Sequence, residues 1–343
     1  LASTKMSPSI MPKEVVESAT EEGVTEYIGT GPFKFVEWKS DQYIHLTKFE
    51  DYQPREEEPS GLAGKREALV DDIYFEFVSD PATQLAGLQT GEYHIAYALP
   101  FDNYDLLVSD PNLEPALDKV GEFTLIYNKV KGLASNFKIR QAINEDIYSM
   151  VPGYMTEEIA NWRSDAGKEF YNINDQELAK QLLEEAGYNG EEFTLMTTRD
   201  YPHFYNASVV IQEQLSQIGM NVKLEVYDWP TLADKRDNAL GEWDAFVNGL
   251  TTVTTPTQLL ALSPTYAGGV QDDKILEMLE QIEFAVSQEE AKQLWDELQG
   301  YAWEHHLPVT ILGGYNTLYG QRSDVKGYIH VHGGVYWNVS IEE

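Results

Sequence analysis

The chain has 343 residues, of which 42% are hydrophobic and 12% aromatic, and this length suits two domains of ordinary size. Its formal net charge of −33 makes a surface that repels nucleic acids and anionic lipids, so neither is expected as a partner. The absence of cysteine excludes disulfides, thiolate metal sites and cysteine nucleophiles. No apolar run approaches the roughly 20 residues that span a bilayer.

The first third of the sequence predicts a series of short strands and helices. A short helix begins near Pro12, and the Gly-Thr-Gly-Pro turn at 29–32 leads into a β-hairpin. Asp80 and Gly91 are typical of the N-cap and the C-terminal end of one helix. The predicted elements are strands 33–38, 43–49 and 72–78, helix 80–92, strand 93–97, helix 102–109 and strand 123–128.

The remainder predicts alternating strands and helices. A helix over 173–188 has its cap at Asn174 or Asp175 and ends at Gly187. A strand, a helix and a strand then follow, which predicts a parallel pair with a right-handed crossover. The predicted elements are helices 136–143 and 173–188, strand 193–198, helix 207–218, strands 221–229 and 243–250, helices 274–285 and 288–304, strand 307–314, and closing segments at 325–328 and 336–341.

Four histidines are the candidate metal ligands in the sequence. His330 and His332 would share one face of a strand, and imidazole suits zinc, copper or nickel. His305 and His306 lie late in a helix, where a cation is favoured without any metal. No serine-nucleophile motif, phosphate-binding loop or dinucleotide fingerprint is present, so we expect no enzyme activity and no cofactor.

Four short motifs in the sequence are distinctive. They are Gly29-Thr30-Gly31-Pro32-Phe33-Lys34-Phe35 with Trp38, Thr90-Gly91-Glu92, Arg140-Gln141-Ala142-Ile143, and Leu182-Leu183-Glu184-Glu185-Ala186-Gly187-Tyr188. Together they resemble the family 5 extracellular solute-binding proteins of ABC importers, which include oligopeptide-, dipeptide- and nickel-binding members. Members of that family carry a long segment before the first of these motifs, so the resemblance implies a C-terminal fragment.

The resemblance implies an α/β, two-lobed fold of the periplasmic-binding-protein type (type II, cluster C) with two strands that cross between the lobes. Residues 1–127 and 313–343 would form a first, incomplete lobe, and residues 128–312 the second. The ligand would bind in the crevice between lobes, beside the crossing strands. An incomplete first lobe would leave a sheet edge exposed, which predicts self-association of the fragment.

The function implied is non-covalent capture of a peptide or other polar solute and its delivery to an ABC permease. The protein would work at the extracellular face of the membrane or in the periplasm, with a lipid anchor on a segment upstream of this chain. The rival hypothesis is an extracellular metal-binding protein or metallohydrolase that uses His305, His306, His330 and His332.

By resemblance, Trp229 is an aromatic residue that faces the ligand, although a core tryptophan is the alternative. Lys235 and Arg236 lie where relatives carry basic residues that meet a ligand carboxylate, or else on a solvated helix face. The segment from Arg199 to Tyr205 is either a pocket rim or ordinary loop packing.

The segment after Gly249 departs from the family pattern. Leu250 replaces a tryptophan, and threonines or Val253 stand where an aspartate would meet the α-amine of a peptide. Threonine hydroxyls can bond a neutral polar ligand, so a peptide, a modified peptide and a sugar-like solute stay open. The predicted ligand-binding residues are Tyr127, Asn128, Arg199, Tyr201, Trp229, Lys235, Arg236, Leu250, Thr251, Thr252 and Thr254.

Overall fold

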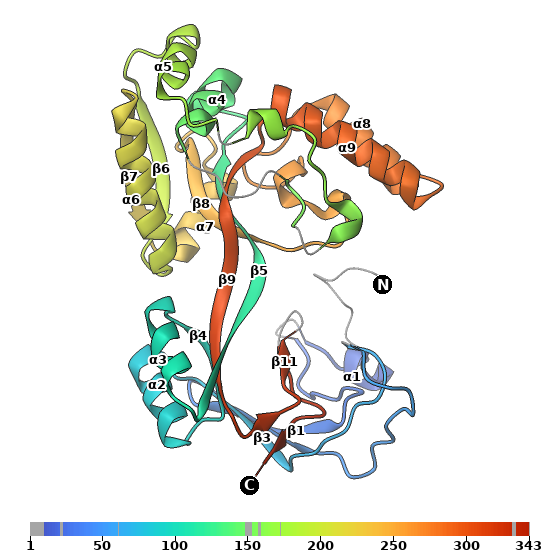
Figure 1. Cartoon of the computed structure of the whole chain (residues 1–343). Coiled ribbons are helices and arrows are strands. Elements are labelled where there is room, and N and C mark those ends of the chain that lie inside the picture. Colours follow the sequence, from blue (N-terminus) through green and yellow to red (C-terminus); the bar gives the residue numbers. More distant parts are fainter. Residues whose placement is uncertain are drawn as a thin grey trace. The chain divides into compact units, whose positions relative to one another are not determined.

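The computed structural model describes residues 10–20, 23–60, 62–147, 153–156, 159–171, 173–330 and 334–342. The chain divides into two compact units (Figure 1): unit 1 contains residues 1–119 and 316–343, and unit 2 residues 120–315. The sequence analysis placed the boundaries after Tyr127 and before Gly313 instead. Strands β5 (Leu113–Tyr127) and β9 (Val309–Arg322) run through both boundaries, so no loop marks the division.

Unit 1 contains the predicted hairpin, in which β1 pairs with β2 antiparallel and β2 with β3. Strand β4 pairs antiparallel with the C-terminal half of β9. A small core of five leucines and Ala96 lies between β4, β9 and helices α2 and α3. The elements are α1 (Lys13–Glu17), β1 (Phe33–Lys39), β2 (Tyr43–Lys48), β3 (Asp72–Glu76), α2 (Pro81–Thr90), β4 (Ile95–Leu99), α3 (Tyr104–Ser109), β10 (Val325–Lys326), β11 (Ile329–His330), β12 (Gly334–Val335) and β13 (Ser340–Ile341).

The caps of α2 are as the sequence predicted. The Asp80 carboxylate accepts a hydrogen bond from the Thr83 backbone N–H at 2.8 Å, and Gly91 ends the helix in the left-handed conformation. A residue without Cβ adopts that conformation at little cost, which explains the glycine.

Unit 2 is built on a sheet in which β9, β5, β8, β6 and β7 are successive neighbours. The predicted parallel pair is confirmed, because β6 and β7 align from Glu192 and Asn221 to Thr198 and Tyr227. Helix α6 connects these two strands and lies along them, while α8 and α9 pack side by side (Figure 1). The elements are α4 (Phe137–Asp146), α5 (Gln176–Glu185), β6 (Glu192–Thr198), α6 (Pro202–Gln217), β7 (Asn221–Tyr227), α7 (Trp229–Asn238), β8 (Ala245–Thr251), α8 (Asp273–Phe284) and α9 (Gln288–His305).

Unit 2 differs from the sequence prediction at two helix starts. Helix α6 begins at Pro202, so the end of the predicted aromatic loop is the first turn of a helix. Trp229, predicted as a strand end, is the first residue of α7, because the Asp228 carboxylate accepts from the Thr231 N–H at 2.9 Å and caps that helix. Pro202 is the first residue of α6 and Pro230 the second of α7, and at these positions proline supplies a helical φ without losing an intrahelical hydrogen bond.

Candidate functional site

A cavity of about 30 Å³ in unit 2 brings together segments that are far apart in the sequence. One wall is a face of the sheet: Glu122 and Thr124 come from β5, and Leu250 from the neighbouring β8. Alternate residues of a strand share a face, which is why Glu122 and Thr124 line the same cavity. The full lining is Glu122, Thr124, Tyr154, Met155, Thr156, Leu250, Thr251, Thr252, Val253, Leu259, Ala261, Val309 and Ile311.

The register between β5 and β8 places Glu122 beside the threonine segment. Glu122 lies opposite Leu250, and Gly121 opposite Thr251. A Cβ at Gly121 would overlap the Leu250 carbonyl, so only glycine permits this close approach. The Thr252 N–H then donates to the Val120 carbonyl at 2.8 Å and extends the pairing.

The opposite wall, residues 153–156, is held by α9. Gln299 is fully buried; its side-chain oxygen accepts from the Tyr154 N–H at 3.3 Å, and its NH₂ donates to the carbonyls of Ser164 at 3.1 Å and Ala166 at 2.8 Å. Through these three hydrogen bonds, one side-chain amide attaches both Tyr154 and the later residues Ser164 and Ala166 to α9.

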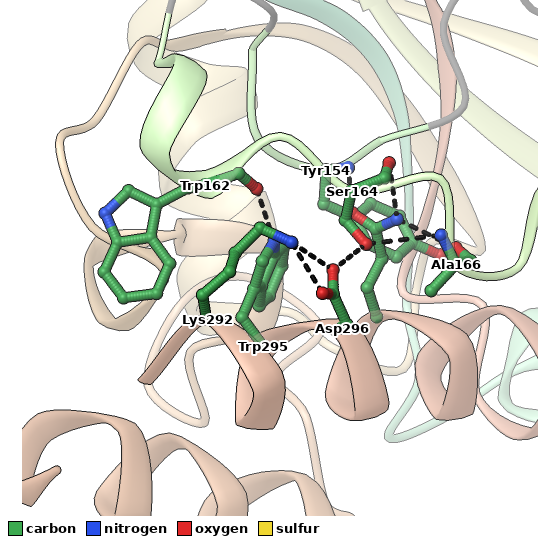
Figure 2. A network of polar contacts seen from close by, with 8 residues as sticks. Tyr154, Trp162, Ser164, Ala166, Lys292, Trp295 and Asp296 are labelled. Carbon is green, nitrogen blue, oxygen red and sulfur yellow. Dashed lines mark hydrogen bonds and ion pairs between the residues drawn. The ribbon is translucent and has the colours of Figure 1, made fainter. Parts of the chain in front are cut away.

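Figure 2 shows the neighbouring part of this network, in which Trp295 and Asp296 of α9 point towards Trp162 and Ser164, and Lys292 contacts Asp296. The Trp295 indole N–H donates to the Trp162 carbonyl at 2.8 Å, and the Ser164 hydroxyl donates to the Asp296 carboxylate, which Lys292 also contacts. The segments at Tyr154, Trp162 and Ser164 are therefore held by hydrogen bonds to α9.

The cavity contains a buried carboxylate and two buried hydroxyls. Glu122 is 5% exposed, Tyr154 4% and Thr156 5%. Within the described residues, the Tyr154 hydroxyl and the Thr156 Oγ1 have no hydrogen-bond partner. Burial raises the pKa of Tyr154 well above its usual range, so its hydroxyl stays protonated. The sequence analysis missed all three, although Glu122 is a carboxylate directly before the apolar run of β5.

An aromatic cluster forms a second feature of unit 2. Tyr201 and Trp229 meet edge to face with centroids 5.4 Å apart, and Phe204 lies 6.1 Å from Trp229. Phe123 stacks on Phe204 at 5.6 Å, and His203 lies 5.6 Å from Tyr315. Phe123 precedes Thr124 on β5, so the strand contributes to the cluster from one face and to the cavity from the other.

The predicted ligand-binding residues have different environments. Leu250, Thr251 and Thr252 line the cavity, as described above. The Thr254 N–H donates to the Gln258 side-chain oxygen at 3.2 Å, which closes the turn that follows.

Tyr127 and Asn128 are fully buried and have internal partners. The Tyr127 hydroxyl lies 2.7 Å from the Thr310 hydroxyl, and the Asn128 amide donates to the Trp243 carbonyl at 2.9 Å. These contacts hold the end of β5 in unit 2.

The predicted basic residues each have a partner nearby. Lys235 lies 2.7 Å from a Glu242 carboxylate oxygen, and Arg236 the same distance from that of Asp237. Arg199 donates to the Tyr205 hydroxyl at 3.0 Å and lies over its ring. A ligand carboxylate at any of the three would have to compete with these contacts.

The histidines of the metal hypothesis belong to different units. His305 and His306 lie in unit 2, His330 lies in unit 1, and His332 is outside the described residues. Burial lowers the pKa of His306 to about 3, and His330 lies 2.7 Å from Asp118. The described part of the chain holds no group of three or more histidine or acidic residues that could bind a metal ion.

Unit 1 has a larger cavity of about 560 Å³. It is bordered by β3, β4 and the C-terminal strands, and its lining is mainly aromatic and aliphatic with several carboxylates. The lining is Val70, Asp72, Ile73, Tyr74, Phe75, Glu76, Val78, Gln84, Glu92, Tyr93, His94, Ile95, Ala96, Tyr97, Val325, Tyr336, Val339 and Ile341.

These features define a class: an α/β chain in two units, joined by long strands, with a small, mainly apolar cavity in the larger unit. Residues 2–271 match the family described as bacterial extracellular solute-binding proteins, family 5 Middle, and the chain belongs to this family. The resemblance found in the sequence is thereby confirmed.

Two curated relatives are similar over most of the chain. It is 32% identical over 274 residues to a probable peptide ABC transporter periplasmic-binding protein of Sinorhizobium fredii, covering 72% of this chain and 51% of that protein. It is 29% identical over 286 residues to the oligopeptide-binding protein AppA of Bacillus subtilis, covering 74% and 50%. The chain thus spans about half the length of the curated relatives it matches.

A solved structure shares the fold. The periplasmic binding protein DppA of Helicobacter pylori, in complex with the peptide STSA, aligns with a TM-score of 0.74 and 24% identity over 93% of this chain and 64% of that one. This likeness confirms the expected periplasmic-binding-protein fold. No helix in the described residues is both long and apolar enough to cross a membrane.

Proposed function

We propose that this chain is the solute-capturing part of an ABC importer. It binds a peptide or another polar solute without covalent change and passes it to a membrane permease. The observation that carries the proposal is the family match over residues 2–271, which includes β5, residues 154–156 and β8 and so most of the cavity lining. The names of the relatives agree with such a role.

The chemistry of unit 2 supports binding rather than catalysis. The cavity offers hydroxyls and one carboxylate, and the aromatic cluster offers apolar area at a small entropic cost. We include Leu250, Thr251, Thr252, Tyr201 and Trp229 in the proposed ligand contacts. Tyr127 and Asn128 act in the proposal by holding β5 rather than by touching the solute.

A position outside the cytoplasmic membrane is part of the proposal, since the relatives are named as periplasmic-binding proteins. Attachment through a lipidated upstream residue stays a prediction.

Native mass spectrometry of the purified chain, followed by calorimetric titration with the compound released from it, tests the proposal. We expect saturable one-to-one binding, with the compound recovered unchanged. Chemical conversion of the compound, lost on adding a chelator, would favour the metallohydrolase instead. Failure of both the released compound and pooled peptides to bind would contradict the proposal.

We also propose that the chain associates with a second copy through unit 1. Tyr74 and Phe77 are 52% and 51% exposed, and among the described residues β3 is the last strand of its sheet. Such an edge can add another strand. Sedimentation velocity over a range of concentrations should show reversible association that Phe77→Ser weakens and Phe284→Ser, on exposed α8, does not. A monomer at every concentration would refute this.

A further inference from the structure

The larger cavity of unit 1 follows the open edges of two sheets. Its lining includes residues 72–76, which form β3, and residues 92–97, which include the first residues of β4. Successive residues of a strand point to opposite faces, so a cavity lined by consecutive residues lies along the edge of the strand. Among the described residues, β3 is the last strand of its sheet and β4 the last strand of the longer sheet. We call this cavity the edge groove.

The pairing of β3 with β2 determines which backbone groups face the edge groove. The Asp71 carbonyl accepts a hydrogen bond from the Lys48 N–H at 2.8 Å, and the Phe77 N–H donates to the Gln42 carbonyl at 2.9 Å. In an antiparallel pair, every second residue bonds across in this way. The N–H and C=O groups of residues 72, 74 and 76 therefore point away from β2, towards the edge groove.

Strand β4 presents its backbone in the same way. The Arg322 N–H donates to the His94 carbonyl at 2.9 Å, and Ala96 lies opposite Gly320 of β9. Ile95 lies between these two positions, so its N–H and C=O groups point away from β9. Two strand edges thus offer donors and acceptors along one groove, and an open edge can add another strand.

The side chains of β3 give the two faces of this edge different chemistry. Asp72 and Glu76 place carboxylates on one face, while the apolar Ile73 and Phe75 lie half-buried on the other. Glu92 adds a third carboxylate, and no lysine or arginine is among the described lining residues. An added strand would lay alternate side chains beside these two faces, so basic and apolar residues in alternation complement them.

The volume of the edge groove is about 560 Å³, within the range of roughly 300–1,000 Å³ that is typical of ligand sites. We propose that the edge groove docks an extended segment of a partner protein in which basic and apolar side chains alternate. The segment forms backbone hydrogen bonds with Tyr74 of β3 and Ile95 of β4 and brings its basic side chains to Glu76 and Glu92. The inference goes beyond the proposed function, because none of the proposed solute contacts lines this groove.

The blocked peptide acetyl-Lys-Val-Lys-Val-Lys-Val-amide is the probe, and calorimetric titration of the purified chain is the measurement. Acetyl-Lys-Lys-Lys-Val-Val-Val-amide has the same charge without the alternation, and a probe N-methylated at its three valines lacks the N–H donors along one edge. We expect saturable one-to-one binding of the probe and at least about tenfold weaker binding of both control peptides. Equal affinity for the non-alternating peptide would show general attraction to an acidic protein and overturn the proposal.

Hydrogen exchange followed by NMR locates the bound probe. The probe should slow exchange of the Tyr74 and Ile95 N–H groups at least about tenfold, because these groups gain hydrogen bonds. Exchange at Phe75 should change much less, since its N–H already faces β2. Protection confined to unit 2 would place the probe in the proposed solute site and refute the inference.

Tyr74 offers a matched pair of substitutions. Tyr74→Ala and Tyr74→Pro both remove the ring, which stacks on His45, but only proline also removes the N–H that faces the groove. Because this N–H does not bond to β2, proline is compatible with the sheet at this edge position. Tyr74→Pro should bind the probe at least about tenfold more weakly than Tyr74→Ala, and equal affinities would refute the strand pairing.

Glu76 tests the charge of the groove, since Asp72 already contacts His45 at 2.7 Å. Glu76→Gln should weaken probe binding about three- to tenfold, because a charge-assisted contact is lost. Glu280→Gln, exposed on α8, removes the same charge and should change nothing. An equal effect of both would refute docking at Glu76. Circular dichroism checks that each variant folds, and if Tyr74→Pro does not, the N-methylated probe decides the strand pairing.

Competition separates the edge groove from solute binding. An excess of the co-purified solute should not displace the probe, and displacement would refute the inference. Failure to capture any solute while the probe still binds would refute only the proposed function. The protein is also tested at its full cellular length, since the chain spans about half the length of the curated relatives it matches. Loss of probe binding in that form would mean that another segment of the same protein fills the groove, which would overturn the assignment to a partner.

Discussion

Glu145 shows how burial changes the ionisation of a single residue in unit 2. It lies in α4, is 7% exposed, and its Oε2 has no hydrogen-bond partner among the described residues. Burial, with a smaller contribution from the charge of Asp175, raises its pKa to about 7. The folded state thus holds a proton that the unfolded chain releases near its ordinary value of 4.5.

Glu145→Gln should therefore stabilise the protein above neutrality. A raised folded-state pKa contributes stability that is full below pH 4.5 and is lost as the pH rises through 7. The neutral amide of the variant does not ionise, so the variant keeps this stability at high pH. Its free energy of unfolding should exceed that of the wild type by about 1 kcal/mol at alkaline pH, after discounting for partial solvent access. Urea unfolding on both sides of this window measures it. Glu283→Gln, exposed on α8, is the control, and an advantage independent of pH would point to packing instead.

Replacing Trp229 tests whether the aromatic cluster contacts the ligand. Its ring contacts Tyr201 and Phe204, while its backbone N–H donates to the Asp200 carboxylate at 2.7 Å. Trp229→Ala removes only the ring and should weaken binding of the co-purified solute about tenfold or more, as expected for a central aromatic contact. Calorimetric titration measures this. Phe284→Ala, 72% exposed on α8, should leave the affinity unchanged, and an equal effect of both would place the ligand elsewhere.

At the scale of elements, α9 determines the shape of the cavity from outside it. The Gln299 side chain bonds the Tyr154 N–H in the cavity wall and the carbonyls of Ser164 and Ala166 further along the chain. Its replacement leaves those groups buried without partners, which costs more than the lost contacts alone. The position of Tyr154 in the cavity wall therefore depends on its hydrogen bond to α9.

Gln299→Ala should lower the free energy of unfolding by about 2–4 kcal/mol. It should also speed amide hydrogen exchange in residues 153–156 and 159–166 more than in β6. Urea unfolding and exchange mass spectrometry measure the two effects, with the exposed Gln293→Ala on the same helix as control. Exchange that accelerates equally in β6 would mean a general loss of stability rather than release of this segment.

At the scale of the whole molecule, the two units have separate cores of unequal size. The core of unit 2 includes the fully buried Trp243, Trp295 and Trp303, whereas unit 1 has two small clusters around Leu107 and Val325. Because burial of apolar area dominates stability, we expect unit 1 to unfold first.

Calorimetry should show two transitions at least about 5 °C apart. Tryptophan fluorescence should mainly follow the upper one, since five of the seven tryptophans lie in unit 2. Of the two in unit 1, Trp38 is already 55% exposed and Trp337 is partly exposed. Leu107→Ala should lower only the first transition, and Leu183→Ala in α5 only the second. One transition seen alike by calorimetry, circular dichroism and fluorescence would show that the units unfold as one.

Prediction from the sequence succeeded where local rules decide the structure. The caps at Asp80 and Asp175, the hairpin of β1 and β2 and the parallel pair of β6 and β7 depend on residues close in the chain. It was less complete for β5 and β9, which extend beyond the predicted 123–128 and 307–314, and it missed α7. Strand length depends on partners that the sequence does not name.

The amino-acid order alone determined the family and the succession of strands and helices, because caps, turns and apolar periodicity act over a few residues. Only the tertiary structure brought Glu122, Tyr154 and Thr156 to one cavity, through the register of β5 on β8 and the anchoring of residues 153–156 by Gln299. Those contacts join residues far apart in the chain, and no local pattern encodes which distant side chains will meet.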